Sequence, residues 1–125
     1  MFKLKWNAHI DHLYVKSNIL NIYGINTIKM GCFMFKAVNG LLLPHLSNLF
    51  ITNNNIHTHC TRQHCNIHVI RHSTRIQASS IRICGVKILN CLDSVVKTAP
   101  SFDIFRSRFR SFIVANAINL LNSVC

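Results

Sequence analysis

The strongest constraint on the fold is the stretch after Pro100, which has the start signals and the spacing of one amphipathic helix. Ser101 is one of the residue types preferred as helix N-caps, and Asp103 favours the positive end of the helix dipole. Beyond them, apolar side chains recur every three or four positions and form one stripe roughly 100° wide. The members of this stripe are Phe102, Phe105, Phe109, Phe112, Ile113 and Leu120. One face of this helix is therefore expected to lie in the core.

Arginines line both borders of the same stripe. Arg106 and Arg110 fall on one border, and Arg108 falls on the other. Long basic side chains at such positions lay their stems along the apolar face and keep their charge in water. We interpret the three arginines as the rim of an amphipathic helix.

The first fifty residues have a looser helical pattern. An imperfect apolar stripe is formed by Leu13, Ile19, Leu20 and Tyr23. Thr27 is then the expected N-cap of a better helix, whose apolar positions follow the 3.6-residue period. These positions are Met30, Phe33, Met34, Ala37, Val38 and Leu41. Asn39-Gly40 is expected to weaken this helix and Pro44 to stop it, with one more short turn between His45 and Phe50.

The middle of the chain, from residue 51 to residue 82, has no helical period. Three consecutive asparagines, Asn53 to Asn55, predict a turn. Two short stretches, 66–71 and 80–84, alternate between apolar and polar residues and have edge-strand character at most.

The predicted fold class is mainly α. Gly85 is expected to break the chain, and residues 86–96 offer one or two short helical turns before the last helix. The whole is predicted to be a small helical domain with an irregular middle segment and at most a short β-hairpin. No repeat or linker divides residues 1–125, so we expect a single unit. A domain of this length buries only about two-thirds of its unfolded surface, so poor stability alone is expected.

Charge narrows the choice of partner. The chain has fourteen lysines and arginines against three aspartates and no glutamate, a net charge of +11. Such an excess cannot be neutralised internally, so we expect a polyanionic partner, nucleic acid before anionic lipid. Asparagines interrupt the longest apolar run near the C-terminus, and a membrane span needs about 20 mainly apolar residues. No membrane association is therefore predicted.

The N-terminal residues predict an intracellular protein. Lys3 and Lys5 are not followed by the apolar stretch of a signal peptide. We expect a nuclear or cytoplasmic location rather than secretion. The six cysteines are then expected to be thiols in a reducing compartment.

Histidine and cysteine are concentrated in one loop, with His57, His59, Cys60, His64, Cys65, His68 and His72. Within it, Cys60, Cys65, His68 and His72 supply the donor atoms that a zinc site requires. Their spacing is not that of an established finger or knuckle. We therefore expect no bound metal, and an independent zinc-dependent nucleic-acid-binding module is the alternative interpretation.

Residues for catalysis are hard to place in this chain. Asp11, Asp93 and Asp103 are scattered, which argues against paired carboxylates and against two-metal phosphoryl transfer. No glycine-rich phosphate loop occurs, and a Cys–His pair would arise by chance in a loop so rich in both. The chain is predicted not to be an enzyme and to need no cofactor.

Four segments carry a further pattern: residues 33–44 read FMFKAVNGLLLP, 56–62 read IHTHCTR, 80–93 read SIRICGVKILNCLD and 100–106 read PSFDIFR. In this order and at these distances they resemble the C-terminal region of non-LTR (LINE-type, jockey-like) retrotransposon reverse transcriptases. The corresponding stretches of that family are FMYK-x-x-NGLLP, H-x-Y-x-T-R, S-I-x-x-x-G-P-K-I-W-N-x-L-P and a final basic, Phe-bearing helix. The resemblance runs from about Ala8 to Phe112.

Departures from the family pattern concentrate in the third segment. Leu89 stands in the place of a tryptophan, and Val86 and Asp93 stand in the places of prolines. His59, in the second segment, replaces a tyrosine. The loss of an aromatic anchor and two rigid prolines indicates a decayed copy, or one that no longer packs on its parent protein.

The resemblance implies a non-catalytic fragment of an RNA-directed DNA polymerase, since the polymerase domain of that family precedes this region. Expected partners are RNA or DNA, bound weakly and without sequence preference, and the missing polymerase core. Arg62 lies in a family motif, whereas the other candidate phosphate contacts rest on charge alone. These others are Arg71, Arg75, Arg82 and Lys87. A translated relic without a selected function is a third interpretation.

Overall fold

Residues 11–116 are described by a computed structural model. Its elements are α1 (Asp11–Lys16), α2 (Ile22–Val38), α3 (Pro44–Ser47), α4 (Asn53–Ile56), α5 (Arg75–Ala78), the π-helix η1 (Ile81–Gly85), α6 (Val86–Cys91), α7 (Ser94–Lys97) and α8 (Phe102–Ala115). Within this range β-pairing amounts to one isolated antiparallel bridge, between Thr52 and Ile67. The predicted mainly α fold with an irregular middle is therefore confirmed.

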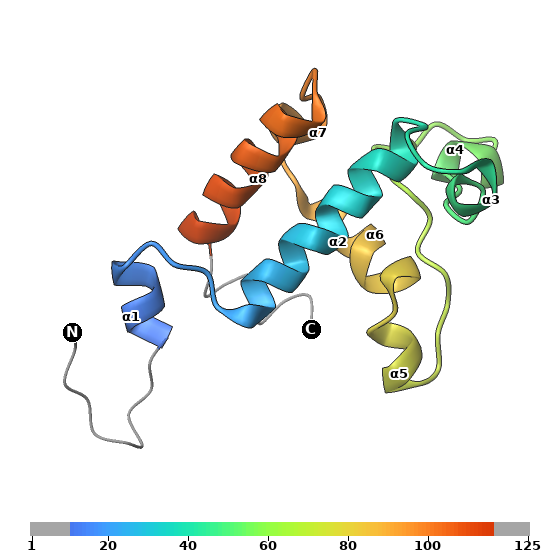
Figure 1. Cartoon of the computed structure of the whole chain (residues 1–125). Coiled ribbons are helices and arrows are strands. Elements are labelled where there is room, and N and C mark those ends of the chain that lie inside the picture. The colour runs from blue at the N-terminus through green and yellow to red at the C-terminus, as the bar shows by residue number, and fades with distance from the viewer. Residues whose placement is uncertain (1–10, 117–125) are drawn as a thin grey trace.

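Helix α2 lies at the centre of the arrangement. Helix α8 packs along one side of it, and η1 and α6 pack on another (Figure 1). The core forms where these elements meet, because each of them presents apolar side chains to α2. The largest fully buried side chains are Phe105, Phe109, Met34, Ile88, Val86 and Cys84.

Aromatic rings fill the contact between α2 and α8. Phe35 stacks on Phe105 with ring centroids 4.2 Å apart, and Phe105 lies 5.4 Å from Phe109. Gly31 of α2 faces Phe109, and a Cβ on this glycine would lie 2.0 Å from the Cε1 of Phe109. The missing side chain therefore allows the close approach of the two helices.

The start and the apolar face of α8 are as predicted. Ser101 Oγ accepts a hydrogen bond from Ile104 N at 3.4 Å, and the helix begins at Phe102. Phe105, Phe109 and Ile113 are buried on its inner face. Leu120, the last predicted member of the stripe, lies outside the described residues.

The predicted start of α2, with Thr27 as N-cap, is wrong. Asn21 caps the helix, and its Oδ1 accepts a hydrogen bond from Gly24 N at 2.9 Å. Thr27 lies inside the helix, where its hydroxyl donates to the carbonyl oxygen of Tyr23. An asparagine side chain satisfies a free N–H group at a helix start, which makes Asn21 the stronger cap here.

The predicted end of α2 is also corrected. The helix ends at Val38, and Gly40 follows with a positive φ of 68°. Leu41 is 61% exposed and does not continue the apolar face. Pro44 does not stop α2 but opens α3, because proline fits the first turn of a helix.

The loose stripe predicted near the N-terminus does not form one helical face. Helix α1 ends at Lys16, and Asn18 has a positive φ of 55°, so the chain turns before α2. Ile19 and Tyr23 are 59% and 67% exposed. Leu20, by contrast with Ile19 and Tyr23, packs against the core.

In the stretch 80–84, predicted to have edge-strand character, residues 81–84 are helical instead, and Ser80 is the N-cap. Ser80 O accepts a hydrogen bond from Cys84 N at 2.8 Å, and η1 continues directly into α6. Gly85 therefore does not break the chain; it is buried beside Met34 of α2. Packing on α2 favours the helical form, which the short alternating pattern alone does not reveal. The predicted short turns in 86–96 are confirmed as α6 and α7.

Candidate nucleic-acid interface

A single side chain of α6 holds Ile67, the first residue of a stretch (67–73) here called the clamped segment. Asn90 Oδ1 accepts a hydrogen bond from Ile67 N at 3.2 Å, and Asn90 Nδ2 donates to Ile67 O at 2.9 Å. Both backbone polar groups of Ile67 are thereby paired, as the burial of this residue requires. On the other side, His68 N donates to Ile51 O at 2.7 Å. The start of the clamped segment is thus fixed from two directions.

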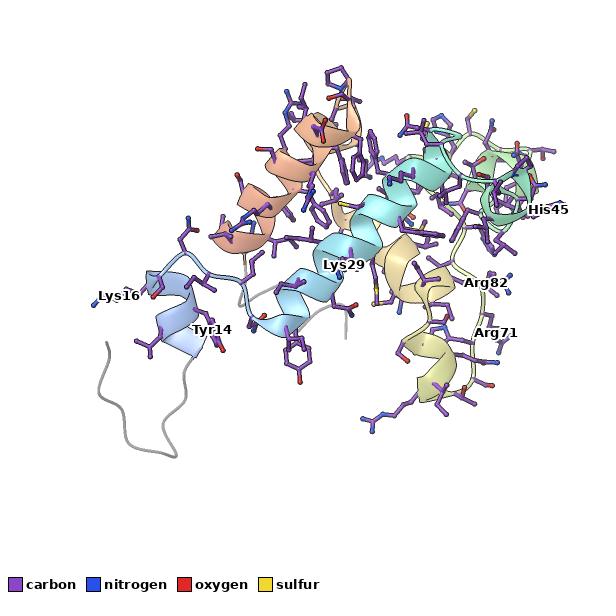
Figure 2. All side chains as sticks on the ribbon, in the orientation of Figure 1. Tyr14, Lys16, Lys29, His45, Arg71 and Arg82 are labelled. Carbon is purple, nitrogen blue, oxygen red and sulfur yellow. The ribbon has the colours of Figure 1, made fainter. Side chains whose placement is uncertain are left out.

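Four of the five predicted contact residues lie on this segment or on the elements that follow it. Arg71 belongs to the clamped segment, Arg75 is the first residue of α5, and Arg82 lies in η1. Lys87 lies in α6, one helical turn before Asn90. The three arginines are exposed and Lys87 is half-buried. In the view of Figure 2, Arg71 and Arg82 point to the same edge of the molecule.

Arg62 lies outside the clamped segment, on an exposed turn. Two asparagines of α4 hold the backbone of this turn. Asn53 Nδ2 donates to Gln63 O at 3.0 Å, and Asn54 N donates to His64 O at 3.0 Å. The predicted turn at Asn53–Asn55 is in fact the helical turn α4, and it positions the loop that carries Arg62.

The five predicted residues share a lack of protein partners. None of their side chains forms a hydrogen bond, an ion pair or a ring contact with another residue in the part of the chain that the structure describes. The carboxylates of Asp93 and Asp103 likewise form no ion pair within that part. The positive charges of the five predicted residues are therefore free to meet an external anion.

Three other basic residues have structural contacts instead. Lys36 Nζ lies 4.4 Å from the centroid of the Phe102 ring. Lys97 Nζ donates to Asn90 O at 3.1 Å, and Arg108 Nη1 donates to Val95 O at 2.9 Å. These contacts link neighbouring elements, so the cations of residues 11–116 include some with structural contacts and some without a partner in that range.

Three further exposed cations have no hydrogen-bond, ion-pair or ring partner within residues 11–116. They are Lys29 of α2 and Arg106 and Arg110 of α8, all exposed. The two arginines were interpreted as the rim of an amphipathic helix, which their exposure agrees with. Their four-residue spacing is a signal for a shared helix face, but it does not say what lies opposite.

The histidine- and cysteine-rich loop does not assemble a metal site among the described residues. No group of three or more His, Cys, Asp or Glu side chains there is arranged to hold an ion. One pair does form: Cys65 Sγ lies 3.1 Å from His64 Nε2, while His64 Nδ1 lies 2.8 Å from Thr61 O. The four donor residues of the alternative zinc module, Cys60, Cys65, His68 and His72, are thus not brought together.

Cys32 of α2 lies in an environment that shifts the pKa of its thiol. Its burial raises the pKa of the thiol above the usual value, and the positive charges of Arg106 and Lys36 act in the opposite direction. The thiol therefore lies close to cations from both α2 and α8.

None of the helices found in residues 11–116 has the length and apolar character needed to cross a membrane. Comparison of the chain with protein-family models, with curated proteins and with solved structures finds no match.

Proposed function

We propose that the chain is a non-catalytic, basic module that contacts RNA or DNA. We further propose that it corresponds to the region C-terminal to the polymerase domain of a non-LTR retrotransposon reverse transcriptase. The binding part is carried by one observation: five cations have no hydrogen-bond, ion-pair or ring partner within residues 11–116, namely Arg62, Arg71, Arg75, Arg82 and Lys87. The family part is supported by the collinear resemblance of the segments between residues 33 and 106.

Phosphate contacts, rather than base reading, are the expected mode of binding. Lysine and arginine side chains on a fixed backbone neutralise phosphates, and this interaction carries no sequence information. A base-stacking platform needs several exposed aromatic rings. Phe105 and Phe109 are fully buried and Phe35 is stacked on Phe105, whereas Tyr23 is the aromatic side chain classed as exposed within residues 11–116. Affinity is therefore expected to depend on salt and not on sequence.

In this proposal the module assists a polymerase core. Nucleotide transfer needs carboxylates that hold Mg²⁺, and such residues belong to the core rather than to this module. The module would hold template RNA near the core through its unpartnered cations. Its affinity would be low alone and would add to that of the core.

The test is a salt titration of binding. Fluorescence anisotropy of a labelled 20-nucleotide single strand would give the affinity of the purified chain at several salt concentrations. With about four or five phosphate contacts, a fourfold rise in salt is expected to weaken binding by a factor on the order of 50 to 100. Strands of equal length and unrelated sequence should compete equally.

A triple variant ties this behaviour to the named residues. Replacing Arg62, Arg71 and Arg75 by glutamine should lower the slope of log affinity against log salt by about 2. The matched control replaces the same three arginines by lysine, which keeps the charge and should keep the slope. An affinity that barely responds to salt, or one strand that competes far better than the others, would show that the proposed mode of binding is wrong.

A further inference from the structure

The register of α2 against α8 is set by aromatic contacts. Phe35 stacks on Phe105, and Gly31 faces Phe109. A step of four residues towards the N-terminus of α2 thus corresponds to a step of four towards the C-terminus of α8. The two helices are therefore antiparallel, as Figure 1 also shows.

This register aligns cations along one border of the helix pair. Lys36 lies over the ring of Phe102, at the start of α8. Cys32, one turn before Lys36, lies close enough to Arg106 for the guanidinium to act on its thiol. One turn further along each helix lie Lys29 of α2 and Arg110 of α8, both exposed at the outer side of this border. Lys29, Lys36, Arg106 and Arg110 are called the α2/α8 border below.

The geometry of the α2/α8 border is that of a short track. Lys29 and Lys36 are seven residues apart, about 10 Å along the helix axis, and Arg106 and Arg110 are about 6 Å apart. The axes of packed helices lie about 8–10 Å from each other, so the two rows run side by side. The half-buried Cys32 is the residue on whose thiol both Lys36 and Arg106 act. About 10 Å corresponds to roughly three phosphates of a strand with 3.4 Å per charge.

Opposing charge is sparse along this track. Asp103 lies one turn before Arg106 on α8, and it forms no ion pair with any described residue. The border thus has four cations against one carboxylate. The contact of Lys36 with the Phe102 ring already restrains one ammonium group, which lowers the entropy lost when an anion binds.

We infer that the α2/α8 border is a second binding surface, which takes the sugar–phosphate backbone of a single nucleic-acid strand. The inference rests on the proposed function and adds a surface that is built from other helices than the clamped segment. A strand bound there runs along the helix pair and covers the thiol of Cys32.

The first test is a triple variant, Lys29→Gln, Arg106→Gln and Arg110→Gln, which leaves Lys36 in place because it packs on Phe102. In the salt titration of the 20-nucleotide strand, the slope of log affinity against log salt should fall by about 0.7 for each of the three cations that contacts a phosphate. The matched control, Lys29→Arg, Arg106→Lys and Arg110→Lys, should keep the wild-type slope. All three positions are exposed, so the thermal midpoint of each variant should stay within a few degrees of wild type.

The second test uses Cys32 as a local probe. The six cysteines fall on six different tryptic peptides, with Cys32 on residues 30–36 and the buried Cys84 on residues 83–87. Alkylation by iodoacetamide, followed by peptide mass spectrometry, should slow several-fold at Cys32 when the strand is present at saturating concentration. Cys84 should react slowly with and without the strand, and it reports any unfolding.

The outcomes separate this inference from the proposed function. If wild-type protein does not bind the strand, both are overturned. If it binds with a steep salt dependence that the glutamine variant of the α2/α8 border leaves unchanged, the inference alone is overturned. The same holds if bound strand leaves the alkylation rate of Cys32 unaltered.

Discussion

Gly31 offers the sharpest test of the packing between α2 and α8. Alanine in place of glycine within a helix normally stabilises it by about 1 kcal/mol. At Gly31 the new Cβ would lie 2.0 Å from Cε1, 2.6 Å from Cζ and 2.9 Å from Cδ1 of Phe109. Carbon atoms in contact are about 3.5–4.0 Å apart, so the ring would have to move by roughly 1.5 Å. We therefore expect Gly31→Ala to destabilise the protein.

The size of the effect follows from the surroundings of the ring. Phe109 is fully buried and lies 5.4 Å from Phe105, so the ring has no free space to enter. Overpacking a core costs about 1–3 kcal/mol, and a stiff ring places this position near the upper value. Subtracting about 1 kcal/mol for the better helix propensity of alanine leaves a net loss of about 2 kcal/mol. The thermal midpoint should fall by about 8 °C in a domain of this size.

Gly24→Ala is the matched control in the same helix. The nearest atom to its new Cβ is the terminal Leu20 Cδ2 at 3.1 Å, which belongs to a flexible side chain. This variant should be between neutral and about 1 kcal/mol more stable than wild type. Urea unfolding followed by circular dichroism measures both variants. In a Phe109→Leu background the penalty of Gly31→Ala should shrink, because the ring that it meets is gone. Equal stability of the Gly31 and Gly24 variants would refute the close approach of α2 and α8.

Two further predictions concern the clamped segment and the cysteine-rich loop. Asn90→Ala removes both hydrogen bonds to the buried Ile67. It should lower the free energy of urea unfolding by about 2 kcal/mol and accelerate amide hydrogen exchange at Ile67. Unchanged exchange would mean that Asn90 does not hold this segment. Protein expressed in zinc-supplemented medium should contain well under one zinc per chain by elemental analysis, because Cys60, Cys65, His68 and His72 are not brought together. One tightly bound zinc that is lost when Cys60 and Cys65 are replaced by serine would contradict this expectation.

Sequence determined the features that depend on a few neighbouring residues. Ser101 and the spacing of Phe105 and Phe109 predict both the start and the buried face of α8, as the structure has them. Cap hydrogen bonds and the helical period act within one or two turns, so they are readable without knowledge of the fold. Asn21 is also a local cap signal. It was overlooked because the apolar positions of the predicted helix begin only at Met30, which made Thr27 look like the cap.

The clamped segment shows which part of the candidate site the sequence does not predict. The charge excess predicts exposed basic residues, and Arg62, Arg71, Arg75 and Arg82 are indeed exposed. Composition does not predict the anchor of the segment that carries Arg71. The two hydrogen bonds from Asn90 to Ile67 join residues 23 positions apart, and no local pattern indicates such a pair.

Tertiary packing alone decided the form of residues 80–85 and the alignment of the α2/α8 border. The short alternating pattern of this stretch is compatible with a strand or a helix. The burial of Cys84 and Gly85, with Gly85 beside Met34 of α2, favours the helix. Arg106 comes to lie near Cys32 only because a missing side chain at Gly31 admits the ring of Phe109. Such contacts join residues more than fifty positions apart, and their register depends on how side-chain volumes fill the shared core rather than on the preferences of either helix.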